Sequence, residues 1–412
     1  MKGPASSRRL PAVAAALGSA FVVWGQAFPL SPLVDAVEGG PFHDAALAYP
    51  AGYILLAPFS AFADLLTFSS KTQAIAWLCW LLGAYWLAAP LRAPRSPLRA
   101  ALGFAGHVLV VVAFLAWAFL APRPMARLTL SDPELLALDL HSHSACSHDG
   151  RRSFTGAANA RWHLDAGFDA WFLTDHNKEA CSRVEAEKDG SRSLTGVELS
   201  LHGAHVVALS PHSVVPPERY QNGPAGLTAF LREAWPVWGA RPVLSLPEYW
   251  KHHWAELDSL AEGMWGEGGL EVANGAPKAL MFPPELRAEA VALARRRGLF
   301  LACATDNHGW SRAAYCWNVA ALEGWGALPR PELEAALTRR MHGPDALRIA
   351  ARRRVETSPG WRAALDPVVG LSVLVRTLSP AAAALTLFWL WVLCGVRRAL
   401  PWGASRRGLP SV

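Results

Sequence analysis

The sequence predicts an α/β fold flanked by membrane-spanning helices. Over residues 128–350, short apolar runs alternate with longer helical stretches, an order typical of an α/β barrel or a doubly wound sheet. Long uncharged runs lie on both sides of this region, and several of its apolar runs end in histidine or acidic residues. We therefore expect one soluble domain between membrane helices, with a site at the ends of its strands.

Apolar runs of strand length recur through the soluble region. Strands are expected at 136–141, 169–174, 195–201, 204–209, 242–246, 269–273 and 299–304. Helices are expected at 155–166, 226–236, 284–297 and 331–341. Pro284 stands at the start of the third helix and Gly298 just past its end, as is common at helix termini.

The membrane prediction rests on run length. The chain has 412 residues, 52% of them hydrophobic, which is enough for a sizeable soluble domain and a membrane part. A helix of about 19 residues crosses roughly 30 Å of hydrocarbon, and uncharged runs of this length occupy 10–33, 73–91, 100–121 and 378–396. A fifth run, 45–67, contains Pro50, Pro58 and Asp64, so its crossing is left open. A cleaved signal peptide would explain the first run alone.

These runs divide the chain into five parts. The prediction is an N-terminal membrane region at 1–127 with three or four transmembrane helices, a soluble domain at 128–350, a linker at 351–376, a C-terminal transmembrane helix at 377–397 and a basic tail at 398–412.

The net charge of +6 is informative mainly through its placement. Basic clusters beside the spans are Lys2, Arg8 and Arg9; Arg92, Arg95 and Arg99; and Arg397, Arg398, Arg406 and Arg407. If 45–67 does not cross the membrane, these clusters are all cytoplasmic and the domain faces outward. Arg123 and Arg127, which also lie beside a span end, are then the exceptions and lie outside the cytoplasm. If it crosses, the domain is cytoplasmic and two clusters violate the positive-inside rule. We expect an integral protein of a bacterial inner membrane and favour the outward topology.

Neither the cysteines nor the basic residues predict another class of site. Cys146, Cys181, Cys303 and Cys316 lack C-x-x-C spacing, so we expect core residues rather than zinc ligands, although an outward-facing domain could pair two of them. No basic run is interleaved with aromatic residues, so no nucleic-acid binding is expected.

Histidines and acids at strand ends predict a metal site. His141 and His143 end the first apolar strand, and alternation places residues two apart on the same face, where both rings can reach one ion. Later strands end in Asp175-His176, near Glu198, and in Asp306-Asn307-His308. In barrels of parallel strands, residues at the carboxyl ends of the strands converge on the active site.

With these residues the chain resembles the PHP superfamily, the polymerase and histidinol phosphatase domains. The matching motifs are D-L-H-S-H-S at 139–144, T-D-H-N at 174–177, G-V-E-L-S at 196–200 and D-N-H-G at 306–309. The resemblance covers about 135–310 and implies a distorted (β/α)7 barrel. It also implies two or three divalent metal ions, usually zinc, manganese or iron.

The resemblance assigns ligands position by position. His141, His143, Glu198 and Asp306 would hold the first metal, with Glu198 bridging to a second. His176 and His308 would hold the adjacent metal. His205 is expected as a further ligand or as a hydrogen-bond donor behind the ligands.

The chain departs from the family pattern in two places. Many members have Ser-Asp-Gly where this chain has Ser-His-Asp-Gly, so the second metal would take either His148 or Asp149, and the spacing favours His148. Members often have His-Pro where this chain has Leu246-Pro247. We therefore expect two metal ions, with a third only if His252 or His253 replaces the missing ligand.

The resemblance and the ligand set imply a metal-dependent hydrolase. Two divalent ions lower the pKa of a bound water and neutralise charge on a phosphoryl oxygen, so phosphoester hydrolysis of a small substrate is the favoured reaction. Asp175 would orient an imidazole or accept a proton, or else cap a turn. Lys278 and Arg312 would contact an anionic substrate, or else be solvated surface charges.

The sequence leaves two alternative functions open. Relatives with similar motifs hydrolyse carboxyl or carbamate esters with the same kind of metal centre. A non-catalytic membrane sensor or transport protein would also bind metal, and His107 and Asp64 within the apolar runs are the residues that favour it.

Overall fold

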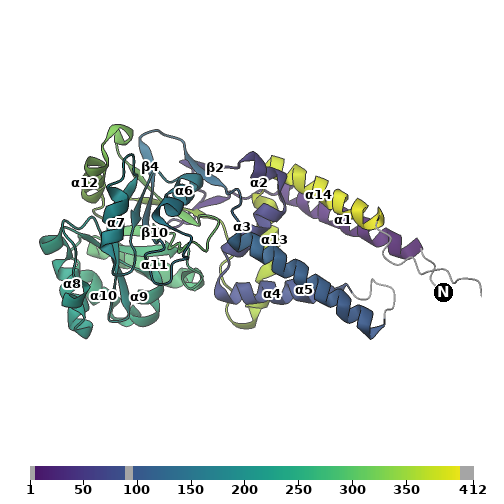
Figure 1. The fold of residues 1–412 in the computed structure, drawn as a ribbon, viewed down its shortest axis with the longest axis horizontal. Coiled ribbons are helices and arrows are strands. Elements are labelled where there is room, and N and C mark those ends of the chain that lie inside the picture. Colours follow the sequence, from purple (N-terminus) through teal and green to yellow (C-terminus); the bar gives the residue numbers. More distant parts are fainter. Residues whose placement is uncertain (1–4, 89–95, 400–412) are drawn as a thin grey trace, which may run out of the picture.

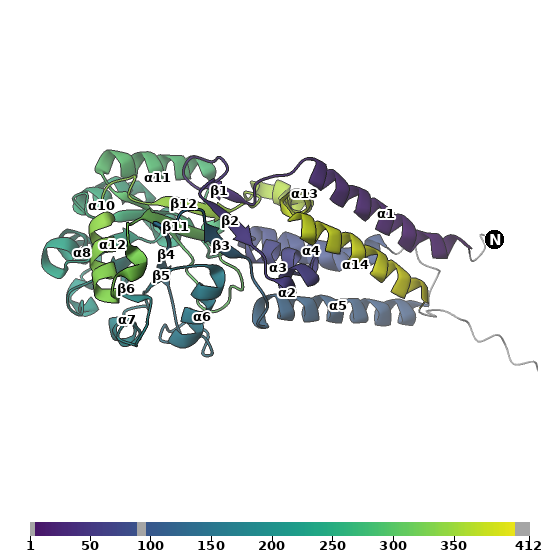
Figure 2. The same cartoon turned by 90° about the horizontal axis from the view of Figure 1, so that it is seen from above.

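The computed structural model describes residues 5–88 and 96–399. It consists of an α/β domain built on one large sheet and a helical part that projects from one side of that domain (Figures 1 and 2). The first and last helices of the chain lie together in the helical part, so both ends of the described chain belong to it.

The sheet has ten strands in the order β1-β12-β11-β4-β5-β6-β7-β8-β9-β10. Their bounds are β1 Leu33–Asp35, β4 Leu135–Ser142, β5 Ala170–Leu173, β6 Ser193–Leu201, β7 Ala204–Leu209, β8 Arg241–Leu244, β9 Gly269–Asn274, β10 Phe300–Ala304, β11 Cys316–Ala321 and β12 Arg348–Arg352. A separate antiparallel pair of strands is formed by β2 (Ala45–Ala48) and β3 (Arg127–Leu130). All seven predicted strands are present as β4 to β10.

The predicted α/β class is confirmed, but the strands are not uniformly parallel. β4, β5 and β6 are parallel to one another, and so are β8, β9 and β10. β7 runs antiparallel to both of its neighbours. The sheet curls until the ends of β4 and β10 meet, where Asp306 N donates to His141 O at 2.9 Å. The seven strands thus curve around a common interior.

Helices cover the sheet at all four predicted places. They are α6 Gly156–Ala166, α7 Glu179–Ala186, α8 Gly223–Trp238, α9 Leu246–His252, α10 Leu257–Gly263, α11 Pro284–Arg297 and α12 Arg330–Arg340, with short 3-10 turns η2 Pro217–Tyr220, η3 Trp254–Glu256, η4 Ala279–Met281 and η5 Trp325–Ala327. The Thr155 side chain caps α6 by accepting from Ala158 N, and Gly167 ends it with φ of 87°, a conformation that glycine adopts without strain.

Alternation along β4 separates the core from the site. Leu136, Leu138 and Leu140 are fully buried in one apolar cluster with β5 and β10. Residues between them point to the opposite face, and this places His141 and His143 together on that face. The apolar residues of β4 therefore fix the direction of its two histidines.

The helical part contains α1 Ala5–Ala27, α2 Ala51–Leu55, α3 Phe59–Thr67, α4 Lys71–Leu87, α5 Pro97–Leu120, η6 Gly360–Leu365, α13 Asp366–Thr377 and α14 Pro380–Ala399. By length and composition, only α5 among the described helices could cross a membrane. The segments Gly360–Thr377 and Pro380–Val396 would add a second span if counted as one, although they meet at a bend of 120°.

Helices lie over all four predicted spans, but α1, α4 and α14 do not individually meet the length and hydropathy of a span. The apolar part of α1, Pro11–Ala27, is shorter. The open run 45–67 folds into β2, α2 and α3 next to the sheet domain, because its prolines divide it into short elements.

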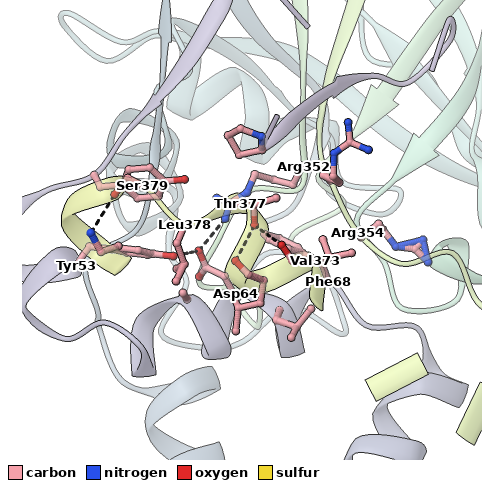
Figure 3. A pocket seen from close by; sticks show the side chains of 16 residues that line it. Tyr53, Asp64, Phe68, Arg352, Arg354, Val373, Thr377, Leu378 and Ser379 are labelled. Carbon is pink, nitrogen blue, oxygen red and sulfur yellow. Dashed lines mark hydrogen bonds and ion pairs between the residues drawn. The ribbon is translucent and has the colours of Figure 1, made fainter. Parts of the chain in front are cut away.

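A buried charge cluster joins the helical part to the sheet. Asp64 of α3 pairs with Arg123 at 2.7 Å and with Arg352 of β12 at 3.3 Å, and it accepts from the Tyr53 hydroxyl at 3.0 Å. Figure 3 shows Tyr53, Asp64 and Arg352 around a cavity of about 40 Å³, which has room for a water molecule or two. Asp64 thus has a structural role at this junction. His107 likewise bridges two helices through Leu81 O, 2.7 Å away.

Candidate metal centre

Histidines and acids from four strand ends converge at the closed side of the curled sheet. His141 and His143 come from the end of β4, and their Nε2 atoms are 3.0 Å apart. Glu198 of β6 reaches both rings through Oε2, at 3.1 Å and 3.2 Å. Asp306, just after β10, places Oδ1 3.4 Å from His143 Nε2. These four residues lie together as the family resemblance implies.

Glu198 also connects this group to two further histidines, His176 and His205. Its Oε2 lies 3.0 Å from His176 Nδ1, and its Oε1 lies 3.1 Å from His205 Nδ1. Glu198 is buried; its Oε2 faces nitrogens of both groups, and its Oε1 faces His205. A carboxylate in this position can bridge two cations.

His176, His308 and Asp149 form the second set. Asp149 Oδ1 is 3.2 Å from His308 Nε2, and Asp149 Oδ2 is 3.6 Å from His176 Nε2. The His143 and His308 rings stack with centroids 3.9 Å apart, which keeps the two sets adjacent. Asp149, rather than His148, faces both histidines.

The donor atoms fit divalent metal ions. In four overlapping triads drawn from these residues, the potential ligand atoms lie within 4.8 Å of one another. Within the described chain, His176 Nδ1, Glu198 Oε2 and His308 Nε2 are buried without a hydrogen-bond partner, although buried polar atoms are normally satisfied. Imidazole nitrogens mixed with carboxylate oxygens suit Zn, Mn and Fe.

Neighbouring charges shift the pKa values of His141 and Asp306 in the direction that favours their ionised forms. Burial lowers the pKa of His141, but the carboxylates of Glu198, Glu271 and Asp306 outweigh burial and raise this pKa well above its usual value. Burial raises the pKa of Asp306, yet the neighbouring imidazoles, His141 first, lower it to about 2. Concentrated negative charge in a buried site favours a cation.

Glu271 is a functional candidate that the sequence motifs missed. Its Oε1 lies 2.7 Å from His141 Nδ1, and its Oε2 accepts from Leu246 N and Asn274 Nδ2. Such a carboxylate fixes the ring of a metal-binding histidine so that its other nitrogen faces the metal. The available signal was an acid inside the otherwise apolar strand predicted at 269–273.

Asp175 lies behind the cluster rather than in it. It accepts from the backbone N and the hydroxyl of both Ser144 and Ser147, at 2.7 to 3.2 Å. The Ser147 Oγ is also 2.9 Å from His143 Nδ1. Since Ser147 donates to Asp175, its oxygen can accept from His143, so Asp175 both caps the turn and orients an imidazole through Ser147.

The other predicted residues differ in their distance from the cluster. The His148 side chain is 76% exposed, and it forms one of the candidate triads with Asp149 and His176. Lys278 is exposed in the loop after β9. Arg312 donates through Nη2 to Leu120 O at the end of α5, 2.9 Å away. The contact of Arg312 with a substrate stays a prediction.

The candidates for a third metal ligand do not reach the cluster either. His253 Nε2 lies 3.0 Å from His202 O, and His252 is exposed at the end of α9. Glu248 of α9, which the motifs did not include, does approach the site, with Oε2 3.9 Å from His205 Nδ1.

A disulfide holds the loop that carries several site residues. Cys146 is bonded to Cys181 of α7, whereas the sequence predicted core cysteines and left pairing as an option. Cys303 and Cys316 are free and buried, as expected of core residues. The bonded loop includes Ser147, which contacts His143, and Asp149.

No protein-family model matches the chain, and no curated protein sequence matches it. Similar solved structures include a protein assigned as a metal-dependent phosphoesterase from Bifidobacterium adolescentis (16% identity, TM-score 0.32, covering 43% of this chain and 89% of that one). PsfC from Pseudomonas syringae has 16% identity and a TM-score of 0.35, with 59% and 98% covered. The lesion-specific endonuclease EndoQ from Pyrococcus furiosus has 14% identity and a TM-score of 0.32, with 45% and 52% covered. These scores are low, so functional inference depends on the geometry of the cluster.

Proposed function

We propose that this protein is a divalent-metal-dependent hydrolase of the PHP type, anchored in a membrane, with phosphoesters as its preferred substrates. The observation that carries the proposal is the position of Glu198, whose buried Oε2 lies 3.1 Å from His141 Nε2 of one ligand set and 3.0 Å from His176 Nδ1 of the other. A single structural metal would not require a carboxylate shared in this way.

The residues divide into two ligand groups. His141, His143 and Asp306 would hold one ion, His176, His308 and Asp149 the other, and Glu198 would contact both. When bound, two divalent ions supply a water of lowered pKa and neutralise charge on a phosphoryl oxygen. Glu271 and Asp175 keep the rings of His141 and His143 in position, which maintains the geometry that the reaction needs.

Lysines around α9, the helix that carries Glu248, favour an anionic substrate over a neutral ester. Lys278 and Lys71 of α4 are close enough to Lys251 of α9 for their charges to act on it. Burial lowers the pKa of Lys251, and the charges of Lys278 and Lys71 lower it further. Lys251 follows Glu248 by about one helical turn, and Glu248 Oε2 lies 3.9 Å from His205 Nδ1.

The test is hydrolysis by the purified full chain in detergent. We expect turnover of p-nitrophenyl phosphate with Mn²⁺ or Zn²⁺, removal of turnover by chelators and loss of both metal and turnover in His141→Ala. His212→Ala is the matched control, because His212 is exposed outside the cluster. Stoichiometric metal without turnover of any phosphate, carboxyl or carbamate ester would contradict the hydrolase and favour a metal-binding sensor.

The membrane proposal is supported by the surface of the helices. Large apolar side chains are exposed along α1, α4, α5 and α14, among them Leu17, Leu87, Leu109, Val110 and Phe388. A soluble protein rarely leaves such contiguous apolar surface in water. We propose that a lipid bilayer surrounds this helical part and that α1, α4 and α14 enter it together with α5. Alkaline carbonate extraction tests this, since an anchored chain stays in the membrane fraction.

A further inference from the structure

A groove whose lining includes four arginines lies where α5 meets the α/β domain. It has a volume of about 370 Å³, and its arginines are Arg123 after α5, Arg151 in the loop after β4, Arg161 of α6 and Arg312 in the loop after β10. Phe154 and Trp162 contribute apolar lining. We call this feature the arginine groove. Figure 2 shows α6 next to the domain-side end of α5.

Three of the four guanidinium groups lack acidic partners. Arg123 pairs with Asp64 at 2.7 Å, whereas no carboxylate of the described chain lies within 4.0 Å of the other three, and the one acid in the lining is Asp165. Arg151 and Arg312 both donate to Leu120 O, at 3.4 and 2.9 Å. Arg312 Nε is buried and has no partner among the described residues. Because each guanidinium has five N–H donors, most of the donors in the groove remain free.

The position of the groove matches the boundary of a bilayer. It begins at Pro122, two residues after the end of α5, the helix with the length and composition of a membrane span. Trp310 beside it is 52% exposed and lies 5.7 Å from Arg151. Exposed tryptophan next to a span is typical of the level of lipid head groups.

We propose that the arginine groove binds the head group of an anionic phospholipid. Planar guanidinium groups bind phosphate oxygens through paired hydrogen bonds, and the lining of Phe154 and Trp162 accommodates the apolar part of a lipid. This inference rests on the membrane anchoring proposed above. It does not depend on the metal reaction.

Lipid in the groove would also act on the metal-binding residues. Arg151 N donates to His308 O at 2.9 Å, and Gly309, which follows His308, is part of the lining. A bound head group therefore steadies the segment that carries one of the candidate ligands.

Binding of lipid by the full chain in detergent tests the proposal. Native mass spectrometry with added phosphatidylglycerol or phosphatidylcholine gives the affinity for each lipid. We expect preference for phosphatidylglycerol and a loss of about tenfold in its affinity in the double variant Arg151→Gln/Arg161→Gln. Arg232→Gln is the control, because Arg232 is an exposed arginine of α8, remote from the helical part.

The other outcomes of the lipid-binding experiment each have a distinct meaning. Equal affinity for the two lipids, or unchanged affinity in the double variant, overturns the proposal. Displacement of the lipid by glycerol phosphate at equal concentration would identify a site for soluble anions instead. Failure of the metal reaction appears separately as absent p-nitrophenyl phosphate turnover, and failure of anchoring as release from membranes by carbonate, so neither is confused with failure of the groove.

Discussion

At the scale of single residues, Glu271 offers a test that separates positioning from ligation. It contacts the His141 nitrogen that faces away from the cluster, so Glu271→Gln keeps the shape of the site and removes a charge. We expect metal affinity to fall about 10- to 100-fold, measured by competition with a chelating dye.

Turnover at saturating metal should largely recover in Glu271→Gln, since all of the candidate ligands remain. A variant that folds normally and binds metal as tightly as the wild type would contradict the positioning role. Glu267→Gln is a useful comparison, because Glu267 pairs with Arg241 away from the metal-binding residues.

The raised pKa of His308 predicts that metal affinity depends on pH. Burial lowers the pKa of this imidazole, but Asp149 and Asp306 outweigh burial and raise it to about 9. A metal ligand must be neutral, so below pH 9 the metal has to displace a proton from His308. Affinity should therefore rise between pH 6.5 and 8.5, by about tenfold per pH unit for each proton displaced. Affinity that is independent of pH, measured in a buffer that does not bind metal, would contradict this.

Site residues could be predicted from the sequence where a local pattern identifies them. His141 and His143 were placed on one face by alternation within an apolar strand, and the structure has them there. Glu271 was missed because its partner, His141, is 130 positions away. Arg312 was given a substrate role for its positive charge, and its hydrogen bond to Leu120 O, 192 positions earlier, is a contact that no local pattern predicts.

At the scale of elements, the disulfide between the loop after β4 and α7 has a measurable contribution. It spans 35 positions, and closing a loop of this size typically stabilises a folded protein by about 2–4 kcal/mol. We expect the double variant Cys146→Ser/Cys181→Ser to unfold at lower denaturant concentration and to bind metal more weakly, because Ser147 and Asp149 lie on the loop. Cys79→Ser is the control, since Cys79 is exposed and free.

Denaturant unfolding of the full chain in detergent, with and without reductant, measures this contribution. Reductant should destabilise the wild type and leave the double variant unchanged. Equal unfolding of wild type and variant in the absence of reductant would show that the bond does not tether the loop.

Elements with their own pattern were predicted, and elements defined by distant partners were not. The strands β4 to β10 and the helix α11 have apolar runs and boundary residues of their own. β12 pairs with β1, more than 300 positions earlier, and β11 pairs antiparallel with β4. The pairing of strands so far apart in sequence depends on the path of the chain between them, which local composition does not encode. The antiparallel direction of β7 has a local cause, because only His202 and Gly203 separate it from its partner β6, and this short connection was not used in the prediction.

At the scale of the whole molecule, the positions of the basic residues predict the orientation in a membrane. The N-terminal end of α1, the N-terminal end of α5 and the C-terminal end of α14 lie at the end of the helical part remote from the sheet (Figures 1 and 2). Arg8 and Arg9 of α1, Arg99 of α5 and Arg397 and Arg398 of α14 belong to these ends. The run 45–67 lies on the side of the sheet.

Because cytoplasmic ends of spans are rich in arginine and lysine, this arrangement predicts an α/β domain outside the cytoplasm. A disulfide such as Cys146–Cys181 persists in that compartment and is rare in the cytosol. We expect a C-terminal green fluorescent protein fusion to fluoresce and a C-terminal alkaline phosphatase fusion to be inactive. Protease added to spheroplasts should digest residues 128–350, and thiol alkylation without reductant should leave both bonded cysteines unmodified. A protected domain with reactive Cys146 and Cys181 would place the α/β domain on the cytoplasmic side instead.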